Sequence, residues 1–164
     1  MLTGKVLALA ALTLSGVWLA ATKSPALSPQ DMIDIQSLYT RYNWMLDSGD
    51  AEGWATTFTP DGVFSIEDQG AAGVSAGHDA IVKFAKGFHA GLGGHVKHWN
   101  TNLMITPNAK GAAGQVYLVL VDFATSPATV IASSTYSDEL VKTAQGWRFT
   151  RRSVKGDVAP KKAP

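Results

Sequence analysis

The stretch GHVKHWNTNLMI, residues 94–105, determines how the rest of this sequence is interpreted. It mixes polar and apolar residues without a helical stripe. After Trp99, the apolar Leu103 and Ile105 alternate with Asn102, Met104 and Thr106. That alternation is typical of a half-buried β-strand. A histidine at the entrance of such a strand, here His98, points either into a packed core or into a pocket. Other chemically active side chains are candidates for the same site if the fold places them close to His98.

The composition is that of one globular domain. The 164 residues suffice for a sizeable core but not for two comfortable domains. A content of 46% hydrophobic and 16% charged residues excludes a disordered chain. The formal net charge of +1 argues against a nucleic-acid partner, which would need a basic face. Because the sequence has no cysteine, disulfides, cysteine nucleophiles, thiolate metal sites and a lipid anchor on cysteine are excluded.

Residues 1–21 are expected to form an export signal. Lys5 gives a positive start, and the apolar run over 6–21 is short for a membrane span. Leu19 or Trp18 falls where a small residue is preferred before cleavage, so a cleaved signal and an uncleaved anchor both stay open. We therefore expect an exported protein, either periplasmic or secreted, or tethered to the membrane by residues 6–21.

The remaining sequence is expected to divide into a linker, a domain and a tail. The linker covers residues 22–27, the domain covers 28–155, and the polar residues 156–164 form a disordered tail. Within the domain, Ser28 and Pro29 begin a long amphipathic helix that should run to about residue 47.

Helices are expected first in the domain and strands last. Asp50 should cap a second, short helix, and a third helix is expected over 80–88. The TPDG residues 59–62 predict a turn before a first strand, and the Gly- and Ala-rich stretch that follows predicts a mobile loop over 68–77. After the strand that contains His98, a hairpin turn is expected at 108–111, and further strands are expected over 114–123, 130–141 and 147–154.

This order predicts an α+β fold, in which a curved antiparallel sheet is wrapped around three N-terminal helices. A strongly curved sheet with one long helix across it encloses a cone-shaped cavity, which is a natural place for a ligand. Tyr42 and Asp47 are about 140° apart around an ideal helix. They share one stripe only if the helix loosens at its end.

A few polar side chains stand in otherwise apolar surroundings, and their chemistry is complementary. A carboxylate such as Asp47 beside the His98 imidazole would fix its tautomer and raise its basicity. A tyrosine can donate a proton, and an arginine can hold an anionic group. Together they suit removal of a proton from carbon and expulsion of a β-leaving group. Strand alternation favours Arg151 over Arg152 on the inner face, unless a bulge intervenes.

Four segments resemble the SnoaL-like branch of the nuclear-transport-factor-like superfamily. They are Tyr42-xxxx-Asp47-xx-Asp50, then FTPDGVF at 58–64, HWNTNL at 98–103 and STYSDELVKTAQGWRFTRR at 134–152. The resemblance covers residues 28–154 and is nearest to hexachlorocyclohexane dehydrochlorinase, bile-acid 7α-dehydratase and scytalone dehydratase. It implies a cone-shaped α+β barrel, no cofactor, and β-elimination by a His-Asp pair on a hydrophobic cyclic small molecule. It also implies a homo-oligomer, dimer or trimer.

Carried over residue by residue, the resemblance implies that His98 is the catalytic base and Asp47 its carboxylate partner. Arg152 matches the arginine of the dehydrochlorinase pocket, and Asp122 falls near a second acid of the bile-acid enzyme. Tyr42 matches a position that is tyrosine in the bile-acid enzyme and lysine in the dehydrochlorinase, which favours a dehydratase. The residues implied to bind substrate are Phe64, Val116, Tyr136, Ser137 and Trp54.

Other functions share these features. The same cone could carry an apolar ligand without catalysis, or the domain could be an isomerase or an assembly module with a filled cone. A meeting of His98 and Asp47 at an open cavity would favour catalysis, and a cavity blocked by Trp99, Trp147 and Phe123 would favour assembly. A metal site formed by the histidines at positions 89, 95 and 98 fits no known spacing, so no metal is expected.

Overall fold

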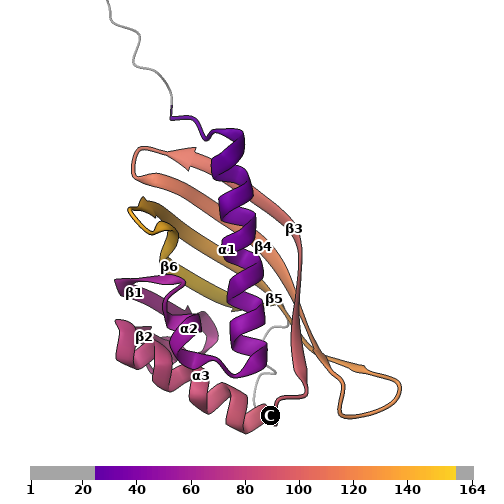
Figure 1. Ribbon diagram of the computed structural model, residues 1–164. Helices are drawn as coiled ribbons and strands as arrows, with labels where there is room; N and C mark the ends of the chain where they lie inside the picture. The colour runs from indigo at the N-terminus through magenta and orange to yellow at the C-terminus, as the bar shows by residue number, and fades with distance from the viewer. Residues whose placement is uncertain (1–24, 158–164) are drawn as a thin grey trace, which may run out of the picture.

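The computed structural model describes residues 25–157 (Figure 1). The expected export signal, positions 22–24 of the linker and positions 158–164 of the tail lie outside the described residues. Within the described range no helix is long and apolar enough to span a membrane. The elements in chain order are α1 (Pro29–Ser48), α2 (Ala51–Ala55), β1 (Phe58–Ile66), the 3-10 helix η1 (Glu67–Gly73), β2 (Val74–Ala76), α3 (His78–Leu92), β3 (Val96–Asn108), β4 (Gly111–Asp122), β5 (Thr129–Thr143) and β6 (Gly146–Gly156).

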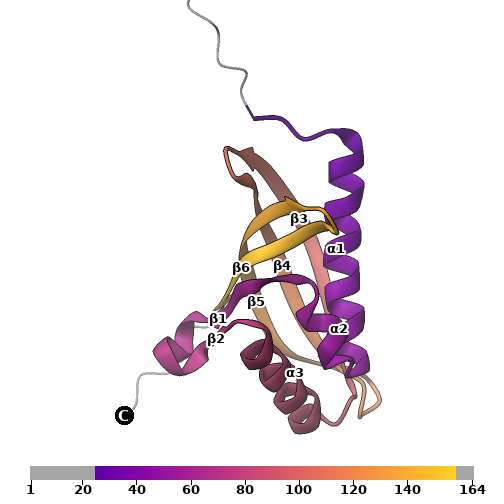
Figure 2. The same cartoon turned by 60° about the vertical axis from the view of Figure 1, so that its left-hand side comes forward.

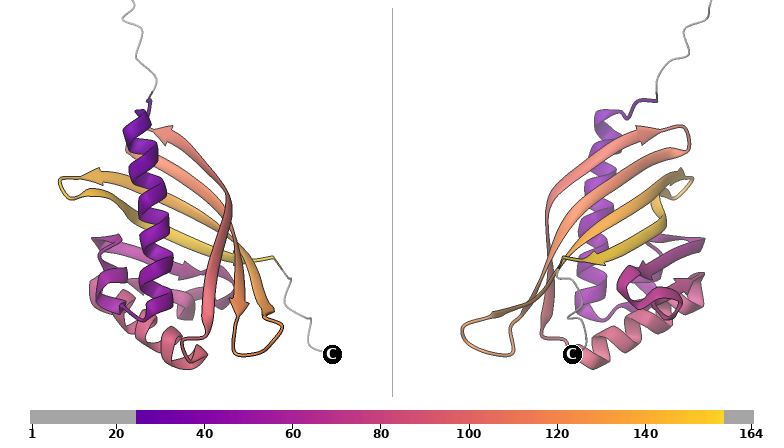
Figure 3. Two further views of the ribbon diagram at one scale, coloured as in Figure 1. Left: turned by 45° about the vertical axis from the view of Figure 1, so that its right-hand side comes forward. Right: turned by 180° about the vertical axis from the view of Figure 1, so that it is seen from behind.

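The strands form one curved sheet in the order β2-β1-β6-β5-β4-β3. Every neighbouring pair is antiparallel except β1 and β6, which run parallel. The helix α1 crosses the concave face of this sheet, and α2 and α3 pack at one end of it (Figures 1 and 2). The predicted α+β class, with a curved sheet wrapped over helices, is confirmed. Figure 3 shows that β3 is an edge strand and lies beside α1.

The long helix begins and ends where the sequence predicts. Ser28 and Asp31 form a reciprocal capping box, in which the Asp31 N–H donates to Ser28 Oγ at 3.1 Å and the Ser28 N–H donates to the Asp31 carboxylate at 3.0 Å. Gly49 ends the helix in the left-handed conformation with φ of 79°, which glycine adopts without steric cost. Asp50 then caps α2 by accepting a hydrogen bond from the Gly53 N–H at 2.8 Å.

The predicted turn at residues 59–62 is wrong, because these residues lie inside β1. Phe58 pairs with Phe149 and Val63 with Arg151, so four residues of β1 face a single residue of β6. The turn-forming residues therefore make a bulge in a continuous strand and do not end it.

The loop predicted over residues 68–77 is also more regular than expected. Its first part continues the 3-10 helix η1, and its second part is the short strand β2. This strand pairs with the end of β1, where Val63 faces Ala76 and Ser65 faces Val74. Backbone pairing with β1 therefore orders β2, although the Gly- and Ala-rich composition of this segment alone indicates flexibility.

Aromatic side chains fill the concave side of the sheet near α2 and α3. Ring centroids of neighbours in this cluster are 4.5–6.0 Å apart, and its members are Tyr42, Trp54, Phe58, Phe64, Phe84 and Phe149. Burial of such rings is a major source of stability in a domain of this size. The cone is therefore packed at this end, and the open space lies between α1 and β3.

Candidate functional site

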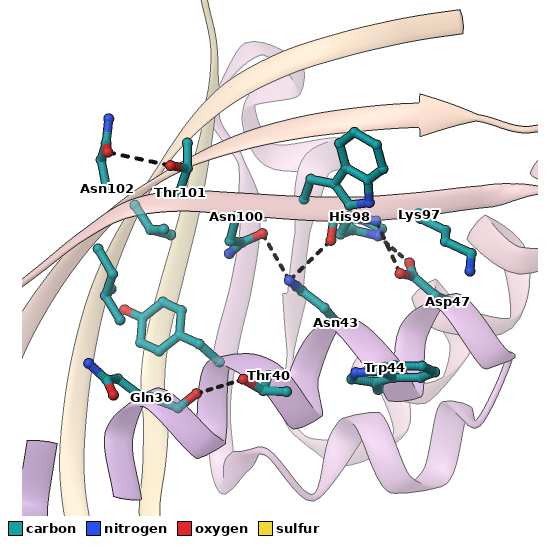
Figure 4. Close-up of a pocket in the computed structure, with 14 residues that line it drawn as sticks. Gln36, Thr40, Asn43, Trp44, Asp47, Lys97, His98, Asn100, Thr101 and Asn102 are labelled. Atoms are coloured by element: carbon teal, nitrogen blue, oxygen red, sulfur yellow. Dashed lines mark hydrogen bonds and ion pairs between the residues drawn. The ribbon is translucent and has the colours of Figure 1, made fainter. Parts of the chain in front are cut away.

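A cleft of about 640 Å³ lies between α1 and β3, and it is called the α1–β3 cleft below (Figure 4). This volume is within the usual range for sites that hold small molecules. The helix contributes Gln36, Tyr39, Thr40, Asn43, Trp44 and Asp47, and the sheet contributes residues 97–103 and Val116. The helical residues recur at spacings of three and four, so one face of α1 forms one wall.

His98 reaches this cleft from the inner face of β3, ahead of a bulge in that strand. Val96 and His98 are buried on the inner face of β3, whereas Lys97 and Trp99 are exposed. The register with β4 shifts between Thr101 and Met104, where Asn102 has a φ of 58°. This bulge moves the inner face from even-numbered to odd-numbered positions, so that the partly buried Leu103 and Ile105 follow.

His98 and Asp47 form a close pair across the cleft. The Nδ1 atom of His98 is 2.5 Å from Asp47 Oδ1, and the backbone N–H of His98 donates to Asp47 Oδ2 at 3.0 Å. Because a carboxylate oxygen accepts, Nδ1 carries the proton and the neutral ring keeps a lone pair on Nε2. The imidazole is only 4% exposed and packs on the Phe88 ring at 5.4 Å. The pair can therefore act as an oriented base.

Asn43 binds the backbone carbonyl group of His98. Its Nδ2 donates to the His98 carbonyl oxygen at 3.3 Å and to Asn100 Oδ1 at 3.0 Å. Asn43 and Asp47 are four residues apart on α1 and so lie on one face of the helix. They bind both backbone groups of His98 that an edge strand leaves without a β-partner.

Arg152 points inward, but it binds an acid that the sequence analysis did not select. In β6, Arg151 pairs with Glu139 and Phe149 pairs with Leu140, so Thr150 is an extra residue that forms the required bulge. The bulge turns Arg152 to the inner face and leaves Arg151 exposed.

The Arg152 guanidinium forms a fully buried ion pair. Its Nε and Nη2 donate to the two carboxylate oxygens of Asp138 at 2.7 and 2.6 Å. The Tyr39 hydroxyl also donates to this carboxylate. Four rings surround the guanidinium carbon at 4.1–4.9 Å, from Tyr39, Tyr42, Tyr136 and Phe149. The arrangement is a cation enclosed by aromatic faces and one carboxylate.

The protonation states in this cluster follow from burial and charge. Burial raises the pKa of Tyr42 to about 12, and the nearby Arg152 guanidinium partly offsets that effect. Burial also raises the pKa of Tyr39 and of Tyr136. Burial alone would lower the pKa of Arg152, but the Asp138 carboxylate outweighs it and holds the pKa well above its usual value. All three tyrosines are therefore neutral and Arg152 is charged.

Most of the other predicted site residues lie in the core. Val116 lines the α1–β3 cleft, but Tyr42, Trp54, Phe64 and Tyr136 are buried and do not line it. Tyr42 is fully buried because α1 stays regular to Ser48, so its side chain and that of Asp47 point in different directions.

The rest lie at the sheet surface. Ser137 is exposed on the outer face because it alternates with the buried Tyr136. Asp122 ends β4, and its carboxylate accepts a hydrogen bond from the Ala124 N–H at 2.8 Å. Trp99 lines the cleft, but its ring is exposed and packs on the exposed Phe123 ring with centroids 5.9 Å apart, so the two rings do not fill the cleft.

Sequence reasoning missed three contributors. Asn43 and Asn100 line the α1–β3 cleft, and neither belongs to a motif that singles it out. Asp138 had a usable signal, since it alternates with Tyr136 and Leu140 on the inner face of β5. Over residues 25–157 no set of three potential ligand side chains is placed to hold a metal ion.

The comparison with known proteins assigns a family. The model of the SnoaL-like domain matches residues 29–153. This range includes every described helix and the whole sheet except the end of β6. No curated protein matches the sequence significantly.

Solved structures share the fold. An NTF2-like protein with a cystatin-like fold from Novosphingobium aromaticivorans has 24% identity and a TM-score of 0.72, covering 80% of this chain and 85% of that one. A protein of unknown function from Mycobacterium tuberculosis has 28% identity and a TM-score of 0.69, covering 82% and 79%. A Catenulispora acidiphila protein, solved in complex with S-DNPA, has 28% identity and a TM-score of 0.69, covering 79% and 96%.

Proposed function

Because the chain belongs to the SnoaL-like family, we propose that it is a cofactor-free lyase acting on a hydrophobic cyclic small molecule in the α1–β3 cleft. The observation that carries the proposal is the contact of 2.5 Å between His98 Nδ1 and Asp47 Oδ1 at the wall of this cleft. An imidazole that a carboxylate orients through Nδ1, and that keeps a lone pair on Nε2, is a general base. The ligand reported for the Catenulispora relative supports a small-molecule site in this fold.

The proposed reaction is a dehydration. His98 Nε2 takes a proton from a ring carbon, the C–H electron pair forms a carbon–carbon double bond, and the neighbouring C–O bond breaks. The departing oxygen takes the proton back from His98, so water leaves and the neutral imidazole is restored. Asp47 stabilises the imidazolium between these transfers. Tyr42, Arg152 and Asp122 do not reach the cleft, so no step is assigned to them.

The test is a panel of cyclic alcohols assayed for loss of water by the absorbance of the alkene product. On an active substrate, His98→Ala should lower kcat by about 10²- to 10⁴-fold. His95→Ala is the matched control, because that histidine is exposed and does not line the cleft. Full turnover by His98→Ala would contradict the proposal.

A second candidate is a carrier of an apolar ligand without catalysis. It is favoured by the contacts of Asp47 and Asn43 with the backbone of His98, because these contacts would also hold an edge strand in a protein with no reaction. A carrier would bind cyclic compounds and release them unchanged. Saturable binding without product, in both wild type and His98→Ala, would establish it.

The site of action and the assembly state are further parts of the proposal. We infer from residues 1–21 that the protein is exported, and from the family that it forms a homo-oligomer. Cell fractionation followed by N-terminal sequencing tests the first point and separates a cleaved signal from a retained anchor. Light scattering on the purified protein tests the second, and a monomer would contradict it.

A further inference from the structure

Two side-chain amides face each other across the α1–β3 cleft, Asn43 from α1 and Asn100 from β3 (Figure 4). Asn43 Nδ2 donates to Asn100 Oδ1 and to the His98 carbonyl oxygen. The other end of each amide, namely Asn43 Oδ1 and Asn100 Nδ2, is buried and has no hydrogen-bond partner among residues 25–157.

The orientation of both amides follows from one backbone group. A carbonyl oxygen only accepts, so the atom of Asn43 that meets His98 O must be the NH₂ group. This NH₂ group also meets Asn100, which must therefore present its oxygen. One unpaired acceptor, Asn43 Oδ1, and one unpaired donor, Asn100 Nδ2, then follow.

Unpaired buried polar atoms are rare in proteins, since each loses its bonds to water and gains nothing in return. These two belong to residues that line the same cleft as His98, and Asn100 lies two residues beyond it on the same face of β3. A hydroxyl group can donate to the one atom and accept from the other. A chlorine substituent or a methyl group cannot donate to Asn43 Oδ1.

We propose that Asn43 and Asn100 are specificity-determining residues that bind a hydroxyl group on the ring of the substrate beside His98. The inference rests on the proposed function and names the two residues that would recognise a hydroxyl group of its substrate. A site built to hydrogen-bond a hydroxyl rejects an analogue that lacks it, because the polar groups of the site are then left unpaired.

The test measures binding of two probes that differ by one hydroxyl, 1-indanol and indane. Wild type should bind 1-indanol about tenfold more tightly, as expected for one or two modest hydrogen bonds. The side-chain amide NMR signals of Asn43 and Asn100 should shift with 1-indanol and not with indane. Asn100→Leu and Asn100→Asp both remove the donor, so each should reduce the preference, and Asn43 Oδ1 would still accept from the hydroxyl. Thr106→Val, at an exposed position of β3 that does not line the α1–β3 cleft, is the control and should retain it.

Equal affinities in wild type, no binding of 1-indanol, or an undiminished preference in both Asn100 variants would each overturn the inference. Asn100→Asp has nearly the shape of asparagine, so it provides the comparison if Asn100→Leu fails to fold. His98→Ala should keep the preference, because binding a hydroxyl needs no proton transfer. A preserved preference without turnover of any ring alcohol would refute the lyase alone, and turnover without the preference would refute this inference alone.

Discussion

Replacing Arg152 with methionine removes the positive partner of a carboxylate that is fully buried. Asp138 would lose two charge-assisted hydrogen bonds of 2.7 and 2.6 Å, and among the described residues only the Tyr39 hydroxyl would still donate to it. Methionine occupies much of the space between the four surrounding rings, so little of the effect comes from a cavity. Leaving one charge of a buried pair without its partner costs about 3–5 kcal/mol. We expect a loss of that size in the free energy of unfolding.

The assay is urea denaturation followed by fluorescence and circular dichroism. Asp138→Leu should cost a similar amount, but the double variant Arg152→Met/Asp138→Leu should lie within about 1–3 kcal/mol of wild type, the cost of the Tyr39 hydroxyl left without its acceptor. Arg151→Met is the matched control on the same strand, and a change below about 0.5 kcal/mol is expected there. Single variants that each cost less than about 1 kcal/mol, or a double variant that shows the sum of both losses, would refute the reasoning.

Three further variants test other parts of the fold by chemical denaturation. Tyr42→Phe removes a buried hydroxyl that has no hydrogen-bond partner in the described part of the chain, so stability at neutral pH should change by less than about 1 kcal/mol. Because the folded-state pKa of Tyr42 is about 12 and an unfolded tyrosine ionises near 10, wild type should lose more stability than the variant between these pH values. The hydrogen bond from Lys142 holds the pKa of Asp31 well below its usual value, so Asp31→Asn should reduce the loss of stability as the pH falls below about 4, and an unchanged acid limb would contradict this. Gly49→Ala should cost about 1–2 kcal/mol, because its φ is 79° and a Cβ there would lie 2.8 Å from His89 Nε2.

The helix boundaries could be predicted because their signals are local. Ser28 and Asp50 cap helices through hydrogen bonds to residues three positions further on, and Pro29 occupies the first turn of α1, as predicted. The TPDG stretch also has a local turn signal, but pairing with β6 overrides it and produces a bulge. Parallel pairing between strands far apart in sequence is invisible to short-range patterns.

The candidate site also contains residues that could be predicted from the sequence and residues that could not. The meeting of His98 with Asp47 was expected from the resemblance, and the structure brings the two side chains together. Asn43 and Asn100 could not be found, because their importance comes from a contact across 57 residues that no spacing encodes. Arg152 faces inward because of a bulge at Thr150. The alternation of residues in β6 showed that such a bulge would be needed, but it could not predict that the bulge forms.

The most direct measurement is the tautomer of His98, determined from the ¹⁵N shifts and couplings of the ring by NMR at about pH 8, where an ordinary histidine is neutral. A base oriented by Asp47 must carry its proton on Nδ1 and keep Nε2 unprotonated, and we predict this single tautomer in wild type. In Asp47→Leu the Nδ1–H form should give way to a mixture. A wild-type ring with its proton on Nε2, or a mixture that does not change in Asp47→Leu, would contradict a catalytic His98–Asp47 pair.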